Sequence, residues 1–294
     1  MQFIKCYVRQ IMRNQLKRWI VLLLTSAIIV VSLLPEQVFA AKLALFIGNN
    51  SYKHVAPLAN AANDARLLYK SVSALGFTGK LLIDGNLVNM KSELNQLGRQ
   101  IRKGDIVFVY YAGHAVQFAG ENYLIPVDVE IEKPEDLLKY GISFTQLFGL
   151  FDQNGSSTNL VVLDACRNNP FDVAFSEART RGLTVTSHMG GARNTIDYSA
   201  KGLVQPARVP GNSLIAFATA PGKVALDGVS DNSPFAISLA KEITEEGIEI
   251  TSVFRNTSIA VKEMTQYQQE PWVTWSLNGS VILRPRRVES VAPF

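Results

Sequence analysis

The stretch Leu160-Val161-Val162-Leu163-Asp164-Ala165-Cys166-Arg167-Asn168 is an apolar run of strand length that ends in polar and reactive residues. A second such run, Ile106-Val107-Phe108-Val109-Tyr110-Tyr111, ends in Ala112-Gly113-His114, and His114 lies 52 positions before Cys166. Continuous apolar runs of this length are typical of strands buried on both faces. The two runs therefore predict buried strands with one reactive side chain at the end of each.

Strand and helix patterns alternate along most of the chain, which predicts an α/β fold with a mostly parallel sheet. A hairpin at 121–126 and a terminal strand region at 273–283 are expected besides the main alternation. The expected strands are 43–48, 77–83, 105–111, 160–165 and 213–218, and the expected helices are 63–75, 90–101, 144–151, 234–246 and 251–264.

Cys166 and His114 both follow the carboxyl end of an expected strand, which is where open α/β sheets bind ligands. If the two strands are neighbours, the side chains can converge. A nearby imidazole lowers the pKa of a thiol and can then protonate a leaving amine. Taken alone, Cys166 is more simply interpreted as a small buried apolar residue, and His114 as an ordinary loop residue. Their matching positions favour a cysteine–histidine pair.

The two motifs resemble those of the caspase-like peptidases. A cysteine in a Gln-Ala-Cys-Arg-Gly context with a histidine about 50 residues upstream is the caspase pattern; here Asp164 replaces the Gln and Asn168 the Gly. The chain is similar to bacterial metacaspases and orthocaspases over residues 42–283. This resemblance implies a caspase-like sandwich, a mostly parallel six-stranded sheet flanked by helices, with Cys166 as nucleophile and His114 as acid and base.

The same resemblance assigns the oxyanion hole to two backbone N–H groups. They belong to Cys166 and to Ala115, the residue after the histidine, where relatives usually carry Gly. Alanine keeps the N–H donor that such a hole requires. The sequence offers no third group to orient His114, and caspases as a family use a backbone carbonyl for this purpose.

Two carboxylates predict which type of substrate residue precedes the cleaved bond. Asp164 lies two residues before Cys166, so strand alternation places both side chains on one face. Asp64 matches the family's Asn-Asp element just after the first strand. Two carboxylates suit a guanidinium, so we expect cleavage after Arg or Lys. The alternatives are a helix-terminal charge for Asp64 and a strand-end polar residue for Asp164.

The first 40 residues resemble an export signal. Five basic residues precede the apolar run 19–34, and Ala40 ends the expected cleavage site. Of the 29 Lys+Arg and 25 Asp+Glu, five and one lie in this segment, which leaves 24 of each. The basic pI thus gives no reason to expect a nucleic-acid partner. We expect an exported domain, periplasmic or secreted; a retained segment 19–34 would anchor it to the inner membrane.

We expect three parts: a signal peptide or anchor at 1–40, a peptidase domain at 41–285 and a tail at 286–294. The variable loop 168–212 carries basic residues that make it a candidate for self-cleavage: Arg179, Arg181, Arg193, Lys201 and Arg208. No cofactor is predicted. Calcium stays possible because several of the metacaspases that the chain resembles require it, but it is not predicted, because Asp172, Asp227 and Asp231 are scattered rather than set at ligand spacing.

The sequence therefore predicts an exported cysteine endopeptidase that acts on peptides or proteins at basic residues. Two readings from other classes stay open. One is a catalytically silent caspase-like module that binds proteins. The other is a redox sensor built on the single thiol of the mature chain.

Overall fold

The computed structural model describes residues 40–152, 157–166, 171, 203, 206, 209–220, 225–226 and 230–286, together with Met12; for Cys166 it describes the backbone only. The chain divides into two compact units, Met1–Phe39 and Ala40–Phe294. The second unit contains the sheet and the helices described below. The expected signal or anchor segment 19–34 lies outside the described residues.

The second unit is built around a sheet with the strand order β2-β1-β3-β6-β7-β8. Strands β2, β1, β3, β6 and β7 run parallel, and β8 is antiparallel to β7. A short antiparallel extension adds β4 to the end of β3, and β5 to β4. The expected mostly parallel sheet of six strands is thus confirmed, with two small strands beyond it. The bounds are β1 Lys42–Gly48, β2 Thr78–Ile83, β3 Ile106–Phe118, β4 Glu121–Leu124, β5 Ile142–Ser143, β6 Thr158–Cys166, β7 Ser213–Phe217 and β8 Trp272–Trp275.

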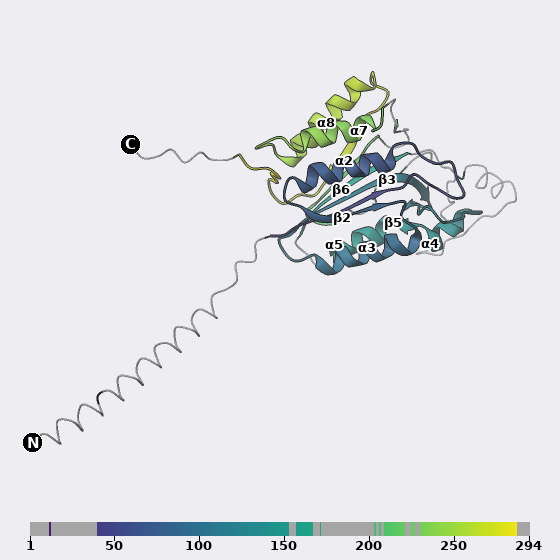
Figure 1. Cartoon of the computed structure of the whole chain (residues 1–294), viewed down its shortest axis with the longest axis horizontal. Helices are drawn as coiled ribbons and strands as arrows, with labels where there is room; N and C mark the ends of the chain where they lie inside the picture. Colours follow the sequence, from purple (N-terminus) through teal and green to yellow (C-terminus); the bar gives the residue numbers. More distant parts are fainter. Residues whose placement is uncertain are drawn as a thin grey trace, which may run out of the picture. The chain divides into compact units, whose positions relative to one another are not determined.

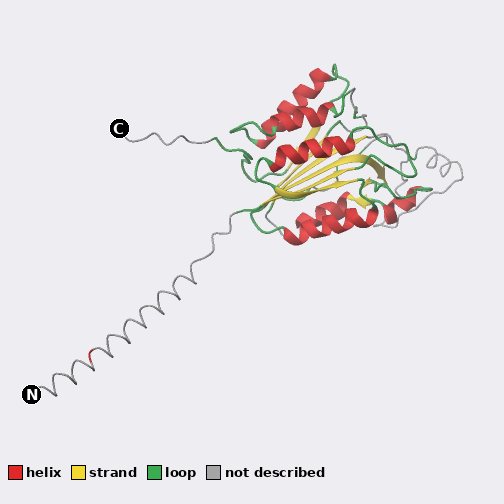
Figure 2. Ribbon diagram, viewed as in Figure 1, coloured by secondary structure: helices red, strands yellow, loops and turns green. Residues whose placement is uncertain are grey.

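Helices cover both faces of this sheet (Figures 1 and 2). One face packs against α2, α7 and α8, and the other against α3 and α5. The helices are α2 Ala61–Ser73, α3 Leu87–Gln100, α4 Leu137–Tyr140, α5 Phe144–Asp152, α7 Pro234–Glu242 and α8 Ile250–Met264, with a 3₁₀ turn, η1, at Pro134–Asp136. This three-layer arrangement follows from the continuous apolar strands, since each must be buried on both faces.

Neighbouring strand residues alternate between the two faces, which produces one core on each face of the sheet. A third cluster, which includes Tyr52, Val116 and Ile125, lies beside them. Phe46, Phe108 and Tyr110 point to the α2 side, whereas Ile47, Val109 and Tyr111 point to the α3 side. All six are fully or almost fully buried. Burial of a large apolar side chain stabilises the fold by roughly 1.5–3 kcal/mol, so these alternating residues fix the register of β1 and β3.

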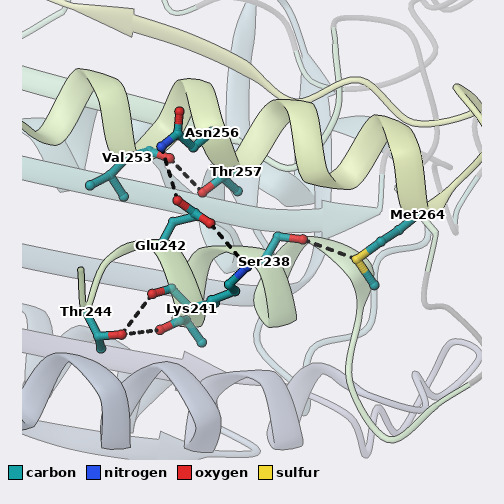
Figure 3. Close-up of polar contacts among 9 residues, drawn as sticks. Ser238, Lys241, Glu242, Thr244, Val253, Asn256, Thr257 and Met264 are labelled. Atoms are coloured by element: carbon teal, nitrogen blue, oxygen red, sulfur yellow. Dashed lines mark hydrogen bonds and ion pairs between the residues drawn. The ribbon is translucent and has the colours of Figure 1, made fainter. Parts of the chain in front are cut away.

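Helix α7 starts at a side-chain cap and is braced by α8. Ser233 precedes Pro234, and its hydroxyl accepts a hydrogen bond from the N–H of Ala236. Serine as N-cap and proline as first residue are the preferred helix start. Figure 3 shows polar contacts between the two helices, among them Asn256 Nδ2 to Glu242 Oε2 at 3.2 Å and Ser238 Oγ to Met264 Sδ at 3.4 Å. These contacts hold the helix whose first turn faces the site described next.

Candidate active site

Strands β3 and β6 are parallel neighbours, and their register pairs the backbone of His114 with that of Cys166. The expected adjacency of the two strands is therefore confirmed. Cys166 is the last residue of β6. Its side chain lies outside the described residues.

The expectation that His114 follows the end of its strand is wrong. Strand β3 continues to Phe118, so His114 lies inside it. The reason is a change of partner: β1 ends at Gly48, opposite Ala112, and β4 then pairs antiparallel with β3 from Ala115 onward. This longer strand holds the histidine on regular backbone rather than on a loop.

His114 is buried, and its ring is held from the loop that follows β1. The ring Nε2 lies 2.9 Å from the carbonyl oxygen of Ala56. The Tyr52 ring lies against the imidazole, with 4.5 Å between the ring centroids. A carbonyl oxygen can only accept a hydrogen bond, so in the neutral ring Nε2 carries the hydrogen and Nδ1 the lone pair. The backbone carbonyl that the resemblance implied is thus present at Ala56.

The loop carrying Tyr52 and Ala56 is fastened by Asp84. This carboxylate accepts hydrogen bonds from the N–H groups of Asn50 and Ser51 at 2.8 and 2.9 Å, and from the Ser51 hydroxyl at 2.8 Å. Burial pushes the pKa of Asp84 up, but these hydrogen bonds outweigh it and hold the pKa below its ordinary value. Asp84 therefore stays ionised and keeps the loop in place near neutral pH.

Ala115 occupies ordinary strand backbone, since it is not among the residues with positive φ. The N–H of Ile125, just beyond β4, donates to the carbonyl of His114 at 3.0 Å. The two ends of a trans peptide point in opposite directions. The N–H of Ala115 therefore points away from β4 and toward β6, where the register that pairs His114 with Cys166 sets it against the carbonyl of Cys166. Alanine in place of glycine causes no backbone strain here.

Asp64 and Asp164 are both buried and are joined through one residue, Ser233. Asp64 Oδ1 accepts from the N–H of Ser233 at 2.9 Å and from Asn232 Nδ2 at 2.8 Å. Asp164 Oδ2 accepts from the Ser233 hydroxyl and from the hydroxyl of Tyr110, each at 2.9 Å. The start of α7 thus brings together two carboxylates that are 100 positions apart in the sequence.

Both carboxylates affect the pKa of Tyr110. Burial raises the pKa of its phenol well above the ordinary value, and the charges of Asp164 and Asp64 raise it further. A phenol with a raised pKa remains a hydrogen-bond donor throughout the neutral range. Tyr110 therefore stabilises the charged form of Asp164.

The sequence did not identify Tyr52, Ala56, Tyr110 or Ser233 as parts of the site. Only Ser233 had a local signal, since Ser-Pro marks a helix start. The basic positions of loop 168–212 and the candidate calcium residues Asp172 and Asp227 lie outside the described residues. Asp231 is described, and its backbone carbonyl accepts from Asn63 Nδ2. Within the described part of the chain, no group of three or more His, Cys, Asp or Glu side chains could hold a metal ion.

None of the helices in the described ranges is long and apolar enough to cross a bilayer.

Comparisons with known proteins agree with this architecture. The family model described as the caspase domain matches residues 41–282. The human mucosa-associated lymphoid tissue lymphoma translocation protein 1 is 27% identical over 133 residues, which are 45% of this chain and 16% of that protein. Its mouse homologue is 28% identical over the same shares. The matched segment is thus about a sixth of the length of these relatives.

A solved structure shares the fold over most of its length. The crystal structure of caspase-1 from Spodoptera frugiperda superposes with a TM-score of 0.57 at 15% identity, covering 85% of this chain and 92% of that one. At this level of identity the likeness concerns the arrangement of the elements. The mixed, mostly parallel sheet between helices is shared.

Proposed function

Because this chain belongs to the caspase domain family, we propose that it is a cysteine endopeptidase that cleaves after Arg or Lys. Cys166 is the nucleophile and His114 the acid and base in this proposal. The observation that carries it is the register of β3 and β6, which sets the two residues opposite each other. The anchored Nε2 of His114, which leaves Nδ1 as the basic nitrogen, supports the same assignment.

The reaction follows from these roles. Nδ1 of His114 takes the thiol proton, and the thiolate attacks the carbonyl carbon of the scissile bond. The carbonyl oxygen becomes an oxyanion, which the N–H groups of Ala115 and Cys166 stabilise. The C–N bond then breaks as the imidazolium gives its proton to the leaving amine. Water, deprotonated by His114, releases the acyl group and restores the thiol.

The pair of buried carboxylates supports a basic preference. Asp64 and Asp164 meet at the start of α7, on the face of the sheet that also carries Tyr110. A guanidinium offers five N–H donors in a planar fork, which two carboxylates can accept. Lysine offers a compact charge to the same pair. An aspartate side chain would be repelled, so substrates with Asp at this position should react poorly.

Export and self-processing belong to the same proposal. The export signal at 1–40 would be removed after Ala40, or segment 19–34 would be retained as an anchor; the N-terminal sequence and the membrane fraction of the expressed full chain distinguish the two. Within the sequence range 168–212, the side chains of Phe171 and Leu203 are buried. Between them lie Arg179, Arg181, Arg193 and Lys201, and we propose self-cleavage there.

The decisive experiment uses residues 41–294 and fluorogenic peptides with Arg, Lys or Asp before the reporter, with and without calcium. We expect hydrolysis after Arg and Lys, abolished in Cys166→Ala and His114→Ala. Asp164→Asn and Asp64→Asn should each lower kcat/KM for Arg peptides at least tenfold, because a charge-assisted hydrogen bond is worth about 1.5–3 kcal/mol.

Three outcomes would count against parts of this proposal. Cleavage after Asp alone would overturn the assignment of the acidic pocket. Iodoacetamide labelling of Cys166 without hydrolysis of any peptide would favour a redox sensor. A folded protein with neither property would favour a silent binding module.

A further inference from the structure

The backbone of His114 is held at both of its polar groups by tyrosine hydroxyls. Its N–H donates to the hydroxyl of Tyr52 at 2.7 Å. Its carbonyl accepts from the hydroxyl of Tyr111 at 2.6 Å. Tyr52 comes from the loop after β1, whereas Tyr111 lies three residues before His114 on β3. Two separate parts of the chain thus converge on a single residue of the proposed dyad.

The hydrogens of this cluster can be assigned. Each phenol has one O–H to donate. The short contact to His114 uses that of Tyr111, so Tyr52 can accept from His114 and donate its own hydrogen to the carbonyl of Ile125 at 3.3 Å. The two hydroxyls are 3.4 Å apart. The cluster is buried and satisfies both phenols, which is the condition under which a polar network makes a core rigid.

Gly113 makes room for the cluster. A Cβ at this position would lie 2.6 Å from the Tyr111 hydroxyl oxygen and 2.7 Å from that of Tyr52. Real Cβ atoms do not approach other atoms this closely, so only glycine permits both hydroxyls to reach the neighbouring peptide. The glycine before the histidine is therefore explained by the two phenols.

The carbonyl that Tyr111 contacts belongs to the same peptide group as the N–H of Ala115. A hydrogen bond to a peptide carbonyl polarises the group and makes its N–H a stronger donor. It also fixes the peptide plane. The N–H of Ala115 points to the β6 side, where the register of β3 and β6 sets it against the carbonyl of Cys166. The proposed mechanism assigns this same N–H to the developing oxyanion when substrate is bound.

We propose that Tyr52 and Tyr111 are positioning residues for the oxyanion hole, acting through the two peptide groups that flank the α-carbon of His114. This inference rests on the proposed peptidase function. Neither phenol touches substrate. They hold the peptide group that carries the Ala115 N–H from the side opposite to β6, and Tyr111 strengthens this N–H as a donor.

Burial keeps both phenols in the form that this role needs. It raises the pKa of Tyr111 well above the ordinary value, and it is also the largest cause of the raised pKa of Tyr52. Both hydroxyls therefore remain protonated over the pH range in which a cysteine peptidase is assayed. Tyr111 is accordingly a donor throughout that range.

The test compares Tyr111→Phe and Tyr52→Phe with wild type in residues 41–294. Each substitution removes one hydroxyl and keeps the ring. Three quantities are measured: kcat and KM for an Arg peptide, the inhibition constant of a peptide aldehyde with Arg at its end, and the rate at which iodoacetamide alkylates Cys166. The aldehyde adds to the thiol and turns its oxygen toward the oxyanion hole, whereas alkylation by iodoacetamide needs only the thiolate.

We expect Tyr111→Phe to lower kcat about tenfold with little change in KM, less than the 10²–10³ lost when a donor is removed outright. The aldehyde should bind weaker by a similar factor, and the alkylation rate should not change. Tyr52→Phe should act in the same direction. Tyr123→Phe is the matched control: Tyr123 lies on neighbouring β4, and the raised pKa of its phenol comes from burial and the charge of Glu121, with no hydrogen bond to a described residue among its causes. All three quantities should stay at wild-type values.

An unchanged kcat in Tyr111→Phe would overturn the inference while leaving the peptidase function intact. A parallel fall in the alkylation rate would also overturn it, because the phenols would then act on the thiol and not on the oxyanion hole. If the melting temperature of Tyr52→Phe is well below that of wild type, the kinetics of Tyr111→Phe alone test the inference. A wild-type protein that hydrolyses no peptide would refute the proposed function, and this assignment with it.

Discussion

At the scale of single residues, Ser233 is the most constrained part of the candidate specificity pocket. Its N–H holds Asp64, its hydroxyl donates to Asp164, and the same hydroxyl caps α7 by accepting from Ala236. One side chain thus couples the position of a carboxylate to the stability of a helix. Substitution by alanine should affect both, and the two effects can be separated.

We predict that Ser233→Ala raises KM for Arg peptides about tenfold, because Asp164 loses one of its charge-assisted hydrogen bonds. The free energy of unfolding should fall by about 1 kcal/mol through loss of the cap. Steady-state kinetics and urea unfolding measure the two quantities. Asn86→Ala is the matched control, since Asn86 caps α3 through the N–H of Asn89 and does not contact either carboxylate; it should lose similar stability without a change in KM.

At the scale of the elements, the strands and helices that carry the site could be read from the sequence. Apolar runs and helical spacing placed β1, β3, β6 and β7 within a few residues of their bounds, apart from the carboxyl end of β3. That end was missed because it depends on pairing with β4, and pairing between strands leaves no local signal. For the same reason β8 is confined to Trp272–Trp275, although the pattern suggested a strand region through residue 283.

The residues of the candidate site also fall into a group that the sequence predicts and a group that depends on contacts between distant segments. Cys166, His114, Asp64 and Asp164 carry distinctive side chains in motifs, so they could be named from the sequence. The group that orients His114 is the carbonyl of Ala56, and any residue type could supply a carbonyl. Ser233 meets Asp64 only after α7 packs beside α2, a contact between residues 169 positions apart.

Strand β3 gives an element-scale prediction at Gly113. Gly113→Ala should push both tyrosine hydroxyls away from His114, at a cost of about 1–3 kcal/mol for an overpacked core. Hydrolysis of Arg peptides should fall to near background, because the His114 peptide is displaced from its register with Cys166. Thermal unfolding and peptide hydrolysis are the measurements.

A glycine in open space is the control. A Cβ at Gly149, within α5, would meet no atom within 4 Å. Alanine there should raise stability by about 0.5–1 kcal/mol, because it favours the helix, and should leave hydrolysis unchanged. A Gly113→Ala variant with wild-type activity would show that the tyrosine contacts do not set the position of His114.

At the scale of the whole molecule, three phenols lie in the interior close to the site. Tyr52, Tyr110 and Tyr111 are all buried, and burial is the largest cause of the raised pKa of each. Below the ordinary phenol pKa of 10.0, both the folded and the unfolded chain keep these protons. Above it the unfolded chain releases them and the folded chain does not, so stability is complete at neutral pH and is lost as the pH rises beyond that value.

We predict that the free energy of unfolding falls by about 1.4 kcal/mol per pH unit for each such phenol above pH ~10, and by about 4 kcal/mol for the three together. A domain with a stability of about 5–15 kcal/mol should therefore unfold cooperatively within a few pH units. Urea unfolding at a series of alkaline pH values measures the slope, and Tyr110→Phe should reduce it by about a third. Val72→Ala, which removes buried methyl groups from α2, should lower the whole curve without changing its slope. An equal slope in wild type and Tyr110→Phe would mean that the Tyr110 phenol ionises as readily in the folded chain as in the unfolded chain. That result would contradict the burial of this phenol between the sheet and the two carboxylates.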